Sequence, residues 1–108
     1  MDILEGRCDR KVVGGKLFRI KVLLELEGQK CSIRRLTILG DFFMHPEEAI
    51  EGLEETIRKA FNGGQDLSIS VTMYLNANGA TLYGGSPIDL SSAVTDAVDD
   101  AMTHVKGA

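Results

Sequence analysis

The sequence predicts an α+β fold with about four antiparallel strands, arranged as two hairpins, and two amphipathic helices packed on one face. Apolar residues alternate with polar ones through residues 17–26 and 67–75, which is typical of half-buried strands. They recur at helical spacing through residues 50–61 and 90–105. A chain of 108 residues suits one domain, so we expect residues 1–108 to form a single unit.

The first predicted hairpin spans residues 16–40. The apolar face of its first strand consists of Phe18, Ile20, Val22, Leu24 and Leu26. After a turn at residues 27–30 the chain returns as a second strand, in which Ile33 is out of phase with the apolar residues that follow. This phase change predicts a bulge near Arg34 and Arg35. Residues 1–12 are more polar, and we expect a flexible or loosely packed segment there.

The first predicted helix follows the hairpin. Pro46 suits a first helical position, and Glu47 and Glu48 complement the positive end of a helix dipole. The apolar stripe of this helix would comprise Ile50, Leu53, Ile57, Ala60 and Phe61. The glycine pair at residues 63–64 would end it.

The second half of the chain predicts another hairpin and another helix. Alternation through residues 67–75 indicates a third strand, and the Asn78-Gly79 pair indicates a tight turn that returns residues 80–83 as a fourth strand. Ser86 is placed to cap a second helix with Pro87 at its first position. The inner stripe of that helix would comprise Leu90, Val94, Ala97, Val98, Ala101 and Val105.

Composition narrows the functional classes. The net charge of −4 divides into +4 over residues 1–40 and −8 over residues 41–108, a polarity that can steer a charged partner. With two cysteines, no cationic leader and no apolar run of membrane-spanning length, we expect a cytoplasmic protein with free thiols. Apart from Phe18, no aromatic side chains are interleaved with the basic residues, which argues against nucleic-acid binding.

No catalytic constellation stands out in the sequence. His45 and His104 lie far apart in the chain, and neither is near a cysteine at metal-ligand spacing. Cys8 and Cys31 lack a neighbouring base. The glycine pairs do not have the spacing of a phosphate-binding loop. We therefore predict no catalytic residue, no metal site and no cofactor-binding residue in this chain.

One stretch carries a resemblance to a known family. Residues 14–57 read GGKLFRIKVLLELEGQKCSIRRLTILGDFFMHPEEAIEGLEETI, with a GGKL strand start, a glycine turn, and a GDFF segment that leads into a glutamate-rich helix. This pattern resembles the C-terminal accessory domain of lipoate-protein ligases over roughly residues 13–60. The YGGSPIDLSSAV stretch is similar to archaeal versions, in which this domain is a separate small subunit of a two-chain ligase.

The resemblance implies a role beside a large catalytic subunit. That role is the ATP-dependent activation of lipoate to lipoyl-AMP, ahead of lipoyl transfer to a lysine of lipoyl-carrier domains in 2-oxoacid dehydrogenase or glycine cleavage proteins. The complex would use ATP and Mg, whereas this chain alone would bind no cofactor and have no activity.

Two regions are candidates for contact with a partner. In the GDFF segment, one of Phe42 and Phe43 would be core and the other an anchor on the large subunit, unless both are core. Asp41 would hold the loop through backbone hydrogen bonds. The remaining candidates are His45 in the same segment and the basic residues of the hairpin, Lys16, Arg19, Lys21, Arg34 and Arg35.

Two other functions remain open at this point. The basic hairpin face could recruit an acidic lipoyl-carrier protein without any part in activation. An iron-sulfur scaffold is a further alternative, although it would need about three cysteine ligands and the chain has two.

Overall fold

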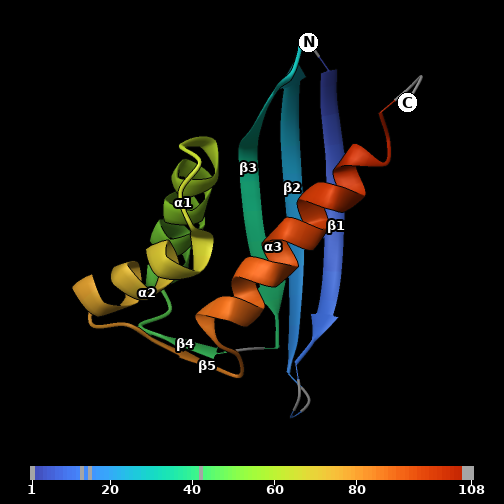
Figure 1. Cartoon of the computed structure of the whole chain (residues 1–108). Helices are drawn as coiled ribbons and strands as arrows, with labels where there is room; N and C mark the ends of the chain where they lie inside the picture. Colours follow the sequence, from blue (N-terminus) through green and yellow to red (C-terminus); the bar gives the residue numbers. More distant parts are fainter. Residues whose placement is uncertain (1, 13, 15, 42, 106–108) are drawn as a thin grey trace.

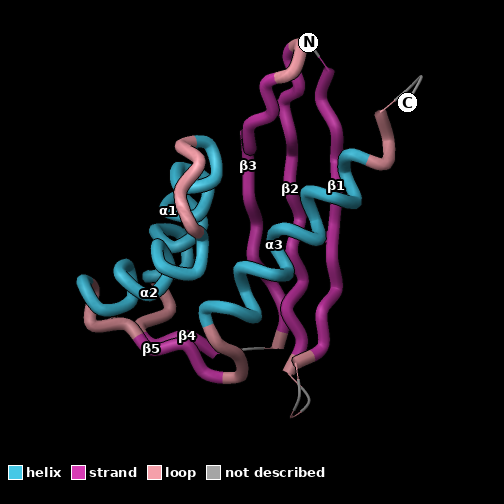
Figure 2. The backbone as a smooth tube through the Cα atoms, in the orientation of Figure 1, coloured by secondary structure: helices cyan, strands magenta, loops and turns pink. Residues whose placement is uncertain are grey.

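The computed structural model describes residues 2–12, 14, 16–41 and 43–105, with the side chain of Phe43 left out of the description. Five strands and three helices follow one another in these residues: β1 (Asp2–Lys11), β2 (Leu17–Glu27), β3 (Lys30–Gly40), β4 (Phe43–His45), α1 (Ala49–Asn62), α2 (Leu67–Ala77), β5 (Thr81–Tyr83) and α3 (Pro87–Met102). The strands β1, β2 and β3 form an antiparallel sheet, and β4 pairs with β5 in a second, small sheet (Figures 1 and 2). The predicted α+β class is confirmed.

The predicted first hairpin is present, bulge included. Leu23 pairs with Arg35 and Leu24 pairs with Ile33, so Arg34 is the extra residue of β3. On the inner face the residues of β2 from Phe18 to Leu24 are buried as predicted. Local alternation and a glycine turn were sufficient signals for this part of the fold.

The expectation of a loose segment over residues 1–12 is wrong. Residues 2–11 form β1, which pairs with β2 from Leu17 to Leu26. The backbone amide of Arg7 donates to a carboxylate oxygen of Asp100 on α3 at 2.9 Å, which ties the edge strand to the helix. The inner face of β1 carries small residues at Gly6 and Cys8, so its alternation is weak in the sequence.

The first helix begins later than predicted. α1 starts at Ala49, whereas Pro46 follows a cis peptide bond and belongs to a preceding turn, in which the Ala49 amide donates to the Pro46 carbonyl at 3.1 Å. The inner stripe agrees at Leu53, Ile57 and Ala60, which are buried. Ile50 and Phe61 are partly buried against the core.

The predicted third strand is a helix. α2 buries Leu67, Val71 and Leu75, which are four residues apart. Asp66 caps it, because its Oδ1 accepts a hydrogen bond from the Ile69 amide at 2.9 Å. The alternation that predicted a strand includes every residue of this helical stripe, so the period alone could not separate the two structures.

The predicted fourth strand exists but has another partner. β5 pairs with β4, with Met44 opposite Leu82, and not with residues 67–75. The second hairpin is therefore absent. A strand at β5 needs an extended neighbour, and the helical α2 cannot supply one.

The last helix agrees closely with its prediction. Ser86 accepts from the Asp89 amide at 3.1 Å, and the Asp89 carboxylate accepts from the Ser86 amide at 2.9 Å, which together form a capping box. Pro87 occupies the first turn. Val105 lies beyond the end of α3 and is half-buried.

The helices cover one face of the three-stranded sheet. α3 packs on β1 and β2, α1 packs on β3, and α2 packs on both helices (Figure 1). The arrangement thus has three helices, of which two contact the sheet, in place of the two predicted. No helix of the described chain packs on the opposite face, which we call the open sheet face. None of these helices is long and apolar enough to cross a membrane.

Candidate functional site

The open sheet face carries most of the predicted basic residues. Alternation and register place Arg19 and Lys21 of β2 on it, beside Arg35 of β3, which is opposite Leu23. Arg34, the bulged residue, extends toward Glu25 with its Nη1 3.7 Å from a carboxylate oxygen. These four candidates therefore do come together on one surface.

The charge of that surface is mixed. Asp9 of β1 lies 3.2 Å from Nε of Arg19, and it also approaches Arg7 at 3.9 Å. Glu5 lines a hollow of about 260 Å³ together with Lys21 and Arg35. The acids of β1 thus partly neutralise the basic hairpin, a contribution that the prediction of a loose segment left out. Exposed pairs of this kind add little stability.

Lys16 lies apart from the open sheet face. Its aliphatic carbons pack against Gly84, in the turn before α3. Asp41 makes the backbone hydrogen bonds that were expected of it, and its partner is Leu17, the residue after Lys16. The Asp41 amide donates to the Leu17 carbonyl at 3.2 Å, and the Asp41 carboxylate accepts from the Leu17 amide. These two hydrogen bonds hold the backbone in place just before the phenylalanines of the GDFF segment.

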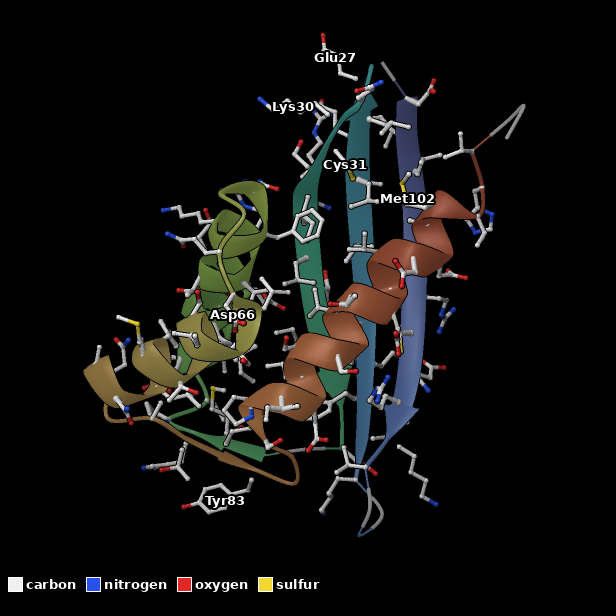
Figure 3. The ribbon with its side chains drawn as sticks, in the orientation of Figure 1. Glu27, Lys30, Cys31, Asp66, Tyr83 and Met102 are labelled. Carbon is white, nitrogen blue, oxygen red and sulfur yellow. The ribbon has the colours of Figure 1, made fainter. Side chains whose placement is uncertain are left out.

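The structure describes only the backbone of one of the two GDFF phenylalanines. Phe42 and the side chain of Phe43 are outside the described residues, so the assignment of one as core and one as anchor stays a prediction. The backbone of Phe43 pairs with Tyr83 in the β4–β5 sheet. Tyr83 is exposed and extends away from the helices (Figure 3). His45 ends β4 and is exposed.

Sequence reasoning missed an apolar groove between α2 and the first turn of α3. It measures about 330 Å³ and is lined by Ser68, Ile69, Thr72, Met73, Ser86, Pro87 and Ile88. We call it the α2–α3 groove. Residues 67–88, which contain every one of these positions, include no Asp, Glu, Lys, Arg or His. This uncharged stretch and the Asp66 cap were the signals available in the sequence.

A second, polar hollow lies between β3 and α1. It measures about 230 Å³, and Arg35, Glu51, Glu54 and Arg58 are among its lining residues. Glu54 accepts from the Ile38 amide at 2.7 Å. Burial raises the pKa of Glu54, the Ile38 hydrogen bond opposes that change, and Glu51 adds to it. Glu54 thereby supports the edge of β3.

The nucleophilic and metal-ligating residue types are dispersed. In the sheet, Cys8 is paired with Ile20 of β2, and Cys31 is paired with Leu26 of the same strand. These two partners are six residues apart, which is about 20 Å along a strand. Burial raises the pKa of both thiols, which keeps them protonated at neutral pH. Within the described residues, no three His, Cys, Asp or Glu side chains gather as a metal site would require.

A solved structure resembles this arrangement over most of its length. It is a chain from an archaeal lipoylation system, a bi-partite lipoate protein ligase and its E2 lipoyl domain from Thermoplasma acidophilum. The TM-score is 0.59 at 24% sequence identity, and the match covers 86% of this chain and 94% of the other. The two chains share one fold. No protein-family profile and no curated protein matches this chain.

Proposed function

We propose that this chain is the accessory subunit of a two-chain lipoate-protein ligase, which acts with a large catalytic subunit in the ATP-dependent activation of lipoate to lipoyl-AMP. The observation that carries the proposal is the shared fold with a chain of the archaeal lipoylation system, which extends over 94% of that chain. The resemblance of residues 13–60 to the ligase accessory domain supports the same function independently.

The dispersal of reactive groups supports an accessory role over a catalytic one. His45 ends β4 and His104 follows α3, so the two imidazoles belong to different parts of the fold. Adenylation needs groups that hold a triphosphate and a divalent cation together at the reacting carboxylate. The large subunit would supply those groups, with ATP and Mg bound to the complex.

An accessory domain can assist such a reaction by closing over the bound nucleotide. Closure excludes water, which strengthens electrostatic interactions at the reacting phosphate. It also protects the acyl-adenylate from hydrolysis until a lysine of a lipoyl-carrier domain accepts the lipoyl group. Both steps would take place in the cytoplasm.

The deciding experiment measures lipoyl-AMP formation by the recombinant large subunit with and without this chain. We expect no product from this chain alone and a strong increase when it is added to the large subunit. Product formed by this chain alone, or a large subunit that is equally active without it, would contradict the proposal.

A recruiting function is the second candidate, because Arg19, Lys21, Arg34 and Arg35 do share the open sheet face. In that case the chain would accelerate transfer to the carrier and leave activation unchanged. Separate assays of lipoyl-AMP formation and of carrier lipoylation distinguish the two functions. The carboxylates of Glu5, Asp9 and Glu25 on the same face make the recruiting function the weaker candidate.

A further inference from the structure

The α2–α3 groove concentrates exposed apolar side chains. Ile69, Met73 and Ile88 are 59%, 66% and 70% exposed, the highest values among the large hydrophobic side chains of the described residues. They come from two different helices and line one groove. Apolar side chains that converge in this way mark a contact surface, whereas scattered ones need no explanation.

The packing of α2 itself does not require these side chains. α2 already buries Leu67, Val71 and Leu75, and its Tyr74 donates a hydrogen bond to the Ala49 carbonyl of α1 at 2.8 Å. Ile69 and Met73 therefore form a second apolar side of the helix. A helix that is apolar on more than one side is normally covered on each of them.

The lining of the groove carries no charged side chain. None of residues 67–88 is charged, although 26% of the chain is. The cores of protein–protein interfaces are depleted in charged residues and enriched in methionine. This compositional signal is independent of the exposure of the three apolar side chains.

The hydroxyl groups of the groove are already used within the chain. Ser68 Oγ donates to Asp66 at 2.7 Å, Thr72 Oγ1 donates to the Ser68 carbonyl at 2.9 Å, and Ser86 Oγ donates to Asp89 at 2.9 Å. A small polar ligand would find few donors here. An apolar partner could cover the groove without leaving these hydrogens unpaired.

We propose that the α2–α3 groove is the surface on which the large subunit docks, through an uncharged segment that inserts aliphatic or aromatic side chains between Met73 and Ile88. This inference rests on the proposed function. A volume of about 330 Å³ is at the lower end for a small-molecule pocket, and it suits one or two side chains. Residues 41–108, the half of the chain that contains the groove, carry −8. The carboxylates of Asp66 and Asp89 border the groove, so the partner surface outside it would be basic.

The same charge argues against a second copy of this chain as the occupant. A two-fold contact places the same patch of both copies face to face, which would bring the two acidic halves together. Repulsion of that kind disfavours a homodimer through the groove.

The test compares the affinity of the recombinant large subunit for wild-type chain, Met73→Glu, Ile88→Glu and a control, Leu39→Glu. Leu39 is 47% exposed on the open sheet face, so the control adds the same charge at another exposed apolar residue. We expect each groove variant to lose about tenfold or more in affinity and the control to change less than about threefold. Because all three side chains are exposed, the melting temperatures should stay close to that of wild type.

The outcomes separate the docking surface from the function. Wild-type binding with unchanged affinity in both groove variants overturns the docking surface and leaves the proposed function in place. Failure of the wild-type chain to bind or stimulate the large subunit overturns both. A wild-type homodimer that Met73→Glu converts to monomer, measured by sedimentation, would also overturn the inference.

Discussion

Gly6 marks the closest approach between the sheet and α3. A Cβ at this residue would overlap the carbonyl oxygen of Ala97 and lie 2.6 Å from Cβ of Ala101. Substitution must therefore displace α3 from β1, because the helix backbone itself blocks the added atom.

We predict that Gly6→Ala lowers the free energy of unfolding by about 1 to 3 kcal/mol, the usual cost of overpacking. Urea denaturation measures the change. The neighbouring Glu5→Ala is the matched control, since Glu5 is exposed and should change stability by less than about 0.5 kcal/mol. Equal stability of Gly6→Ala and wild type would show that α3 does not contact β1 as closely as described.

Glu54 links stability to pH. Burial raises its pKa above the ordinary value of 4.5, so the folded protein holds this proton to higher pH than the unfolded chain. Between pH 4.5 and the raised pKa the folded state binds more protons, and the contribution of Glu54 to the free energy of unfolding falls as pH rises.

We predict that Glu54→Gln removes this fall and is more stable than wild type above that window, because the amide oxygen can still accept from Ile38. Denaturation curves from pH 3 to 7 test it. Glu55→Gln is the contrast: a hydrogen bond from Arg58 lowers the pKa of Glu55, so wild-type Glu55 contributes a rise with pH that this variant loses. Parallel pH profiles for wild type and Glu54→Gln would contradict the prediction.

At the scale of elements, α2 depends on local capping and on its contact with α1. Asp66, which is labelled in Figure 3, caps its first turn by accepting from the Ile69 amide. The Tyr74 hydroxyl fills the space beside Gly52, where a Cβ would overlap it. One local cap and one contact with another helix thus hold a helix whose sequence also alternates like a strand.

We predict that Asp66→Ala destabilises the protein by about 1 kcal/mol through loss of the cap. The amides of the first turn of α2 should then exchange hydrogen faster, as measured by mass spectrometry or NMR. Asp66→Asn keeps an accepting oxygen and should behave nearly as wild type. A uniform increase in exchange throughout the chain, without a local increase in α2, would argue against capping as the mechanism.

The elements that sequence reasoning predicted correctly have signals that lie close together in the chain. The β2–β3 hairpin shows its bulge as a phase change at Ile33, and α3 shows its capping box within four residues. The strand β1 was missed because Gly6 and Cys8 give its inner face little hydrophobic contrast. Its burial comes from α3, about 90 residues later, and no local pattern contains that contact.

In the candidate site too, features with a local sequence signal were predicted, and features that depend on distant contacts were missed. Alternation along β2 placed Arg19 and Lys21 on one face correctly, whereas the neutralising Asp9 required the pairing of β1. The α2–α3 groove joins Met73 to Ile88 across a loop and β5, so it appears only once α2 is a helix. A strand over residues 67–75 would instead place Met73 on the same side as Leu67, Val71 and Leu75.

The whole molecule has one continuous core. Its buried residues come from β2, β3, β4 and all three helices. The charge asymmetry follows the layers, because residues 1–40, at +4, contain the three-stranded sheet and residues 41–108, at −8, contain the helices. Opposite net charges in packed layers favour their association.

We predict that sheet and helices unfold together. Labelling of Cys8 and Cys31, which reports on β1 and β3, should have the same urea midpoint as far-UV circular dichroism, which reports mainly on the helices. Asp66→Ala should shift both midpoints equally. Labelling that precedes the loss of helical signal would show that the sheet opens independently.

The contact between α1 and the edge of β3 has a consequence for behaviour at high concentration. Asn62 accepts from the Ile33 amide at 2.7 Å and donates to its carbonyl at 3.0 Å, and Glu54 accepts from the Ile38 amide. These side chains occupy backbone groups that an edge strand otherwise offers to another chain. The β3 edge is thereby blocked against templating a foreign strand, so fibril growth from this edge would first require α1 to detach.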